Sequence, residues 1–192
     1  MNPLLRIAGV DEAGRGCLAG PVVAAAVVLI EPIEGLRDSK RLSAKARVRL
    51  ALEIKERAAG WGIGQASVAE IDQLNILQAS LLAMRRAVAA LPFVPDAVEV
   101  DGNQDPQGGW PTTCWIGGDD LRPAIMAASI LAKTTRDDWM LAADARFPGY
   151  GHAVHKGYGT ARHLLALSEL GASPEHRMSF APCRRVLERA IP

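Results

Sequence analysis

Apolar residues form two runs near the N-terminus, separated by a glycine-rich segment. Residues 6–11 make a short extended-type run that ends in an acid, and residues 21–30 make a longer run without a charged side chain. A Val- and Ala-rich run of this length is typical of a strand buried on both faces. Because Gly14, Gly16 and Gly20 lie between the runs, the pattern predicts two strands joined by a bend or a hairpin.

Helical and extended patterns alternate in the next part of the chain. Ser43 can cap a helix that runs to about Ala59, and residues 61–66 predict a third, glycine-interrupted strand. Ser67 and Glu70 fit a capping box, in which the two side chains bind each other's backbone donors at a helix start. Apolar residues at alternating spacings of three and four predict that the next helix packs on the core through one stripe. This stripe comprises Leu74, Leu77, Leu81, Met84 and Val88.

The second half of the chain predicts two further strands and two helices. Residues 96–101 read as a strand that ends in an acid, and residues 113–116 as another short strand. Pro123 suits the first turn of a helix that continues through Lys133, and a final helix is expected from about Gly159 to Gly171. Strands first, then strands alternating with helices, predict an α/β fold with a mixed sheet flanked by helices.

Length and composition limit the possible architectures. A chain of 192 residues without a dividing low-complexity tract predicts one domain over residues 1–192, with a helical part from about residue 140. The longest uncharged apolar stretch, residues 18–30, is shorter than the roughly 18 residues that span a bilayer. No apolar segment of signal-peptide length precedes the first acids, so we expect a cytoplasmic protein that does not enter the membrane.

Charge is unevenly distributed although the net charge is only +1. Residues 91–120 contain six acids and no Lys or Arg, whereas residues 151–192 contain six Lys and Arg, three acids and all four histidines. An acid-rich stretch without local bases needs distant partners, solvent or cations, and a basic segment can face a phosphate backbone. The distribution therefore favours metals and nucleic acid as ligands.

Neither the cysteines nor the histidines show a spacing typical of a metal site. The three cysteines, Cys17, Cys114 and Cys183, are far apart and lack a Cys-x-x-Cys pair, so we interpret them as reduced structural thiols. The four histidines show no recognisable ligand spacing, and each is interpreted as a structural residue or a phosphate contact. They are His152, His155, His163 and His176.

The segment Gly14-Arg15-Gly16-Cys17-Leu18-Ala19 formally matches the G-x-G-x-x-A fingerprint of dinucleotide-binding proteins. That fingerprint opens a helix, but here Pro21 and a Val/Ala run resume extended structure. The adjacent acids Asp11 and Glu12 would also lie beside a pyrophosphate. A nucleotide-binding oxidoreductase is therefore kept only as a minor alternative.

Acids occur where the predicted strands end. Asp11 and Glu12 end the first strand, Asp101 ends another, and Asp119 and Asp120 precede a helix. Carboxylates brought together by a central sheet repel one another unless divalent cations lie between them. Two Mg²⁺ ions about 3.5–4 Å apart can stabilise the attacking and leaving oxygens of phosphodiester hydrolysis. The alternative interpretation of adjacent acids is a solvated turn.

Two glycine-rich segments suggest substrate contacts. In Gly14-Arg15-Gly16 the missing Cβ atoms allow backbone groups to approach a ligand, and a ribose 2′-hydroxyl is one group that such atoms can read. Tyr158 lies in a glycine-rich loop beside Lys156, where an aromatic ring can stack on a sugar or base. A half-buried loop anchor is the competing interpretation of Tyr158.

Taken in order, several motifs resemble ribonuclease HII, the bacterial type 2 ribonuclease H. The resemblance covers nearly the whole chain. The matching stretches are GVDEAGRG at residues 9–16, LAGPVVAAA at 18–26, DSK at 38–40, DGN at 101–103, GD at 118–119, AASILAK at 127–133, TRD at 135–137, HKGY at 155–158, HR at 176–177 and SF at 179–180.

This resemblance implies an RNase H-like fold with a central mixed five-stranded sheet flanked by helices. It also implies a site for two Mg²⁺ or Mn²⁺ ions formed by Asp11, Glu12, Asp101 and Asp119, with Asp120 as the rival for the fourth position. Substrate contacts would come from the backbone of residues 14–16, which binds the 2′-hydroxyl and the adjacent phosphate, and from side chains elsewhere. The implied substrate-binding residues are Gly14, Arg15, Gly16, Lys40, Lys156 and Tyr158.

The implied activity is endonucleolytic cleavage of the RNA strand of RNA–DNA hybrids, with water as nucleophile. Family members also cut 5′ of single ribonucleotides in duplex DNA and leave 3′-hydroxyl and 5′-phosphate ends. Two positions depart from the family pattern, because Gly117 stands where Lys is frequent and Cys17 where Pro is frequent. We expect a monomer without the N-terminal extension of ribonuclease HIII, and residues 184–192 lack the aromatic pair of a sliding-clamp-binding peptide. A catalytically silent nucleic-acid-binding module is the second hypothesis.

Overall fold

A five-stranded mixed sheet forms the centre of the protein in the computed structural model, which describes the backbone of residues 5–190 and the side chains of residues 5–186. The strands are β1 (Ile7–Ala13), β2 (Val22–Val28), β3 (Gly60–Ala66), β4 (Ala97–Asp101) and β5 (Thr112–Trp115). Their order is β3-β2-β1-β4-β5. β1 and β2 form an antiparallel pair, as do β2 and β3, whereas β4 runs parallel to β1 and β5 parallel to β4. The predicted mixed sheet is confirmed.

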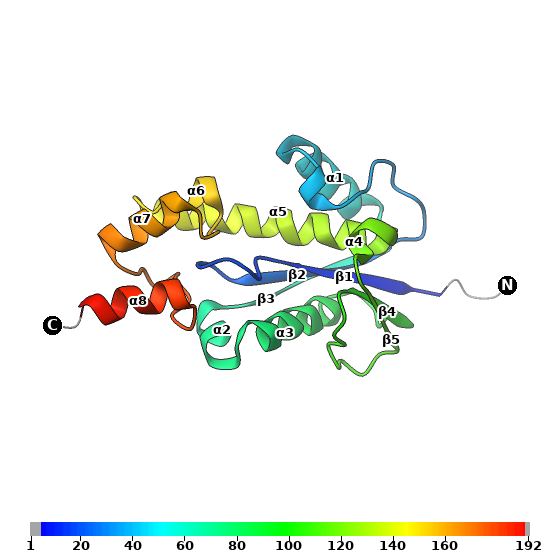
Figure 1. Cartoon of the computed structure of the whole chain (residues 1–192). Helices are drawn as coiled ribbons and strands as arrows, with labels where there is room; N and C mark the ends of the chain where they lie inside the picture. Colours follow the sequence, from blue (N-terminus) through cyan, green and yellow to red (C-terminus); the bar gives the residue numbers. More distant parts are fainter. Residues whose placement is uncertain (1–4, 191–192) are drawn as a thin grey trace.

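Helices cover both faces of this sheet, with α1 and α5 on one face and α2 and α3 on the other (Figure 1). α6, α7 and α8 gather at the end of the molecule away from the N-terminus (Figure 1). The helices are α1 (Ala44–Arg57), α2 (Val68–Leu74), α3 (Ile76–Ala89), α4 (Gly118–Leu121), α5 (Pro123–Arg146), α6 (His152–His155), α7 (Ala161–Leu170) and α8 (Ala181–Ala190), and a short 3-10 helix spans Ser39–Arg41. None of the helices in the described part of the chain combines the length and apolar character needed to cross a membrane.

β2 is buried along its whole length because it supplies both layers of the core. Alternate strand residues point to opposite faces. Ala24 and Ala26 therefore join the cluster that contains the α3 residues, and Ala25 and Val27 join the cluster that contains the α5 residues. This explains why the strand has a continuous apolar sequence instead of an alternating one.

The long helix α5 lies close against β1, which positions the site described below. A Cβ atom on Gly9 of β1 would lie 2.2 Å from the carbonyl carbon of Ala124, at the start of α5. Only glycine allows this approach without a shift of the backbone. Pro123 occupies the first turn of α5, as predicted.

The structure corrects two helix predictions. The helix expected after the Ser67 capping box is divided at Asn75, whose φ of 71° ends α2 and whose side chain accepts a 3.1 Å hydrogen bond from the Gln78 N–H to cap α3. Leu74 is consequently 38% exposed, and of the predicted stripe only Leu81, Met84 and Val88 are buried. The helix expected to be the last one corresponds to α7, and α8 follows it.

Candidate active site

Three aspartates from separate segments meet beside the parallel pair of β1 and β4. Val10 pairs with Val100, so the next residues, Asp11 and Asp101, come to lie near each other where the pairing ends. Asp119 joins them from α4, and one carboxylate oxygen of each aspartate lies within 4.8 Å of the other two. A carboxylate cluster of this kind offers the hard oxygen ligands that Mg²⁺ and Mn²⁺ prefer.

Glu12 lies next to this group but is not part of the three-aspartate cluster. It lines the same cavity as Asp11 and Asp101. Its Oε1 atom is 3.5 Å from Nη1 of Arg15. The structure thus brings together all four acids that the resemblance assigns, with three of them in closer contact.

Backbone donors hold two of the carboxylates in place. The Gly118 N–H donates a 2.7 Å hydrogen bond to Oδ1 of Asp101, and the Glu12 N–H donates one of the same length to Oδ1 of Asp11. Ser129 on α5 partly offsets the rise in the pKa of Asp11, and its hydroxyl is 2.9 Å from that of Ser39. These contacts fix the carboxylates while leaving oxygens free to bind a cation.

The environment of the carboxylates disfavours their negative charge, so it favours protonation or the binding of a cation. Burial raises the pKa of Asp11 well above its usual value, and the charges of Glu12 and Asp101 raise it further. Burial is also the main reason that the pKa values of Glu12 and Asp101 are raised. Buried carboxylates in mutual repulsion bind a divalent cation readily, since its charge removes the repulsion. The residues present therefore fit the expected metal site.

Asp119 and its neighbour Asp120 lie in different surroundings. Asp119 is buried, and its Oδ2 atom is 3.1 Å from Nζ of Lys40, whereas Asp120 is exposed and pairs with Arg41 at 3.3 Å. Gly117 has a left-handed conformation (φ 70°) at the start of α4, the helix that contains both acids. The geometry supports Asp119 over Asp120 as the fourth acid.

A cavity of about 230 Å³ adjoins the carboxylates. Five of the six substrate-binding residues implied by the resemblance line it: Gly14, Arg15, Gly16, Lys40 and Tyr158. Lys156 does not line it, and the carbonyl of this residue accepts a 2.8 Å hydrogen bond from Arg136. The segment 14–19 leads into β2 and not into a helix, which argues against a dinucleotide-binding loop.

Four further residues line the cavity, to which the sequence analysis assigned no role: Ala13, Ser39, Ser129 and Lys133. Ser129 and Lys133 are four residues apart on α5 and so lie on one face of that helix. This spacing, combined with the acids at the strand ends, could have indicated that Ser129 and Lys133 face the carboxylates. Lys133 donates a 2.7 Å hydrogen bond to Asp137, and its Nζ atom lies 5.7 Å from the centroid of the Tyr158 ring.

A larger hollow of about 590 Å³ lies between α7 and α8, away from the acids. Apolar side chains dominate its walls, and its charged residues are Glu169 and Arg185. It lacks the converging carboxylates that hydrolysis requires. The smaller cavity is therefore the candidate active site.

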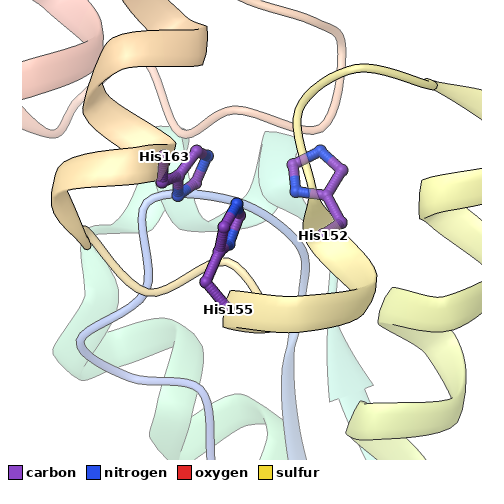
Figure 2. Close-up of side chains that lie close together, drawn as sticks. All are labelled: His152, His155 and His163. Carbon is purple, nitrogen blue, oxygen red and sulfur yellow. The ribbon is translucent and has the colours of Figure 1, made fainter.

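The four histidines, which the sequence left as separate residues, form one buried cluster. His152 and His155 from α6 and His163 from α7 face one another (Figure 2). One nitrogen from each lies within 4.8 Å of the other two, a distance compatible with a metal ion. His176 completes the cluster, with its Nε2 atom 3.0 Å from Nε2 of His163.

Ring geometry and hydrogen bonding argue against a metal in this cluster. The rings of His155 and His163 stack at 4.1 Å with an angle of 13° between their planes. A ligating imidazole directs its lone pair within its own plane, so two nearly parallel rings cannot converge on one ion. His155 accepts from the Gly157 N–H and faces the Tyr150 carbonyl, and His163 faces the Tyr158 carbonyl. We therefore retain the structural interpretation.

The chain is similar to known proteins over nearly its whole length. A family model described as Ribonuclease HII matches residues 8–183. The chain is 57% identical over 185 residues to a protein named Ribonuclease HII from Thiobacillus denitrificans, covering 95% of this chain and 91% of that protein. It is 58% identical over 184 residues to one of the same name from Halorhodospira halophila, covering 94% of each.

Two solved structures show the same architecture. The ribonuclease H2 of Pyrococcus horikoshii OT3 is 26% identical and superposes with a TM-score of 0.83, covering 96% of this chain and 98% of that one. The RNase HII of Archaeoglobus fulgidus, solved in complex with PCNA, is 25% identical with a TM-score of 0.71, covering 90% of this chain and 92% of that one.

Proposed function

The chain belongs to the ribonuclease HII family and is a metal-dependent type 2 ribonuclease H, and we propose that it cuts next to ribonucleotides by means of Asp11, Glu12, Asp101 and Asp119. Its substrates are RNA–DNA hybrids and duplex DNA that contains single ribonucleotides. Cleavage falls on the 5′ side of the ribonucleotide and leaves 3′-hydroxyl and 5′-phosphate ends. The observation that carries this proposal is the meeting of three aspartates within 4.8 Å beside a cavity lined by Gly14, Arg15 and Gly16.

The four carboxylates would hold two divalent cations, Mg²⁺ or Mn²⁺. Such cations, when bound, activate a water and stabilise the attacking and leaving oxygens of the phosphodiester. The backbone donors to Asp11 and Asp101 fix these ligands before substrate arrives, and the donated hydrogen bonds leave other carboxylate oxygens available. Lys40 and Lys133 place positive charge at the cavity, where the phosphates of a nucleic acid would lie.

We further propose that the enzyme acts as a monomer in the cytoplasm. The Archaeoglobus relative was solved with PCNA. The tail of the present chain lacks the aromatic pair of a clamp-binding peptide, and its last two residues lie outside the described part of the structure. We therefore propose that this chain does not bind a clamp through that tail.

A cleavage assay tests the proposed function. A labelled duplex with one ribonucleotide is incubated with the protein in the presence of Mg²⁺, in the presence of Mn²⁺, and in the presence of a chelator. We expect a single cut 5′ of the ribonucleotide with either metal and none with the chelator. Binding without cleavage under all three conditions would support the catalytically silent module instead.

Tyr158 is expected to distinguish a single ribonucleotide from a continuous hybrid. The residue is 44% exposed at the cavity, where its ring can stack on the deoxynucleotide that follows the ribose. Stacking contributes roughly 1–3 kcal/mol, which corresponds to about tenfold to a hundredfold in affinity. Tyr158→Ala should therefore slow cleavage at a single ribonucleotide more than cleavage of a continuous hybrid, as measured by kcat/KM at fixed salt.

The comparison variant for this prediction is Lys156→Ala. A lysine that contacts phosphate does not distinguish ribose from deoxyribose. Its loss should therefore slow cleavage of both substrates similarly and reduce the salt dependence of substrate binding. Equal losses on both substrates for Tyr158→Ala, together with a lowered melting temperature, would instead make Tyr158 a loop anchor.

A further inference from the structure

Two arginines are completely enclosed beneath the segment that joins β1 to β2. Arg136 on α5 and Arg177 before α8 are both 0% exposed. Neither takes part in an ion pair within the described residues. Enclosing a guanidinium without a carboxylate is unfavourable unless hydrogen bonds replace its water. In both cases backbone carbonyls provide those hydrogen bonds.

The two arginines divide the carbonyls of this segment between them. Arg177 donates to the carbonyls of Gly14 (2.8 Å), Arg15 (3.0 Å), Gly20 (2.9 Å) and Pro21 (3.2 Å). Arg136 donates to those of Ala19 (3.0 Å), Pro21 (3.1 Å) and Lys156 (2.8 Å). Of the two arginines, only Arg177 therefore holds the peptide groups that follow Gly14 and Arg15, and the Cys17 N–H also donates to the Gly14 carbonyl at 3.3 Å.

The orientation of these two peptide groups determines where their N–H groups point. In a trans peptide the N–H is directed opposite to the C=O, and the described residues contain no cis peptide bond. Because Arg177 holds the carbonyls of Gly14 and Arg15, the N–H groups of Arg15 and Gly16 point away from Arg177. Among the hydrogen bonds of the described chain, neither N–H has a protein acceptor. Both residues line the cavity beside the carboxylates.

Consecutive N–H groups that face one side form a concave site for a negatively charged or lone-pair oxygen. The enclosed guanidinium behind the same peptides adds positive potential at this site. Together these features suit an oxygen of the substrate's sugar–phosphate backbone at the scissile position.

We propose that Arg177 is a positioning residue, which aims the N–H groups of Arg15 and Gly16 at the ribonucleotide by fixing the carbonyls of Gly14 and Arg15. This inference rests on the proposed function, because it names the part of the structure that orients the substrate-binding segment. Arg177 itself touches neither the reacting phosphate nor the carboxylates. Its effect on the substrate passes through the two peptide groups.

Arg177→Lys tests this role, with Arg136→Lys as the matched control. Both changes shorten a fully enclosed arginine beneath the same segment, but only Arg177 binds the two peptides in question. Each change is introduced into an Asp101→Asn background, which is compared with Asp101→Asn alone. Affinity is measured for a duplex with one ribonucleotide and for the same duplex with a deoxynucleotide there.

We expect Arg177→Lys to weaken binding of the ribonucleotide duplex by about tenfold, as the loss of one or two oriented hydrogen bonds implies. If the N–H groups bind the 2′-hydroxyl, the preference for ribose should fall, and if they bind a phosphate, both duplexes should bind more weakly. Arg136→Lys should change both affinities much less. Unchanged affinity for Arg177→Lys, or equal losses for the two lysine variants, would overturn the inference.

Amide hydrogen exchange of the wild-type protein gives a second measurement that does not depend on the folding of a variant. The Arg15 and Gly16 amides should exchange rapidly in the free protein and slowly when the ribonucleotide duplex binds in the absence of cleavage. No change on binding would contradict the inference. A wild-type protein that neither binds nor cuts this duplex would refute the proposed function itself, whereas a protein that cuts normally with unchanged amides refutes only the role of Arg177.

Discussion

At the scale of single residues, the local backbone decides which of several adjacent acids reach the site. Asp119 and Asp120 are neighbours in the sequence, yet one is buried beside Lys40 and the other is exposed beside Arg41. Both acids belong to α4, where successive side chains point in directions about 100° apart, so only one of the two faces the cluster. The resemblance implies Asp119, and its buried position close to Asp11 and Asp101 supports that assignment.

Asp119→Asn should reduce cleavage far more than Asp120→Asn. An amide keeps the shape of the carboxylate but is a much weaker ligand for a divalent cation, so we expect a loss of at least about a hundredfold at position 119 and less than about threefold at position 120. The measurement is kcat/KM on the single-ribonucleotide duplex in Mg²⁺. The reverse order would place Asp120 in the site.

Asp101→Asn should abolish cleavage and yet raise the melting temperature of the metal-free protein. The raised pKa of Asp101 means that ionisation above the unfolded-state pKa destabilises the folded protein, so at pH 7 this carboxylate weakens the metal-free fold. An asparagine oxygen can still accept the hydrogen bond from the Gly118 N–H. Added Mn²⁺ should stabilise the wild-type protein and have little effect on the variant.

Thermal melting with and without Mn²⁺ checks this prediction, and cleavage is assayed in parallel. A lower melting temperature for metal-free Asp101→Asn would show that its hydrogen bond outweighs the repulsion among the acids. Activity near the wild-type level would remove Asp101 from the catalytic group.

At the scale of elements, the segment between β1 and β2 shows what glycine contributes. Gly14 has a φ of 94°, and a Cβ atom there would lie 1.9 Å from Nε of Arg136. Gly16 has open space around the equivalent position. The fold therefore requires glycine at position 14. At position 16 the fold does not require glycine, and we expect Gly16 to matter for substrate binding.

Gly14→Ala and Gly16→Ala should consequently differ in stability. We expect Gly14→Ala to destabilise the protein by about 1–3 kcal/mol, since it combines a strained φ with a collision against an enclosed side chain. Gly16→Ala should change stability by less than about 0.5 kcal/mol and act mainly on cleavage. Urea unfolding measures the first effect and kcat/KM the second, and similar stabilities for the two variants would contradict this account.

Sequence patterns predicted the elements that depend on local signals and missed features that depend on tertiary contacts. The buried β2, the Ser43 cap and the Ser67 capping box are each encoded within a few residues, and all are confirmed. The break at Asn75 was missed because the apolar stripe continues across it while the backbone turns.

For the site, acids at strand ends predicted where the carboxylates gather, because the sheet places those ends together. Family resemblance then supplied the individual roles. The enclosed arginines were missed because arginine in a sequence is interpreted as exposed or as a phosphate contact. Their carbonyl partners in the segment between β1 and β2 all lie more than 100 residues away along the chain, so no local pattern could show these contacts.

At the scale of the whole molecule, the buried histidine cluster ties α6 and α7 to the segment that contains His176. His176 accepts from the Ser173 N–H through Nδ1, so its Nε2–H donates to Nε2 of His163, whose Nδ1–H donates to the Tyr158 carbonyl. This chain of donors and acceptors requires both rings to be neutral. Burial lowers the pKa of His176 to about 4. Protonation of the cluster should thus loosen the loop that carries Tyr158.

His152 is the exception within the cluster. It is 0% exposed, and among residues 5–186 neither of its ring nitrogens has a hydrogen-bond partner. Its ring stacks on Tyr150 at 5.4 Å, and burial lowers its pKa to about 4. A buried polar group without a partner destabilises the fold, whereas an apolar ring in the same place would keep the stacking.

His152→Phe should therefore stabilise the protein, and more strongly at acid pH. A histidine whose folded pKa is lowered to about 4 stays neutral in the folded state but binds a proton in the unfolded state below about pH 6.5. Stability should fall as the pH drops from about 6.5 to about 4, by at most about 1.4 kcal/mol per pH unit for each such histidine. Phenylalanine removes the contribution of His152 and should add about 1 kcal/mol even at pH 8, where no histidine is protonated. Melting curves between pH 4 and pH 8 measure both effects. The control is His163→Phe, which breaks two hydrogen bonds and should lower stability at every pH. If His152→Phe is less stable than the wild type at pH 5, His152 has a hydrogen-bond partner in solution, such as a buried water.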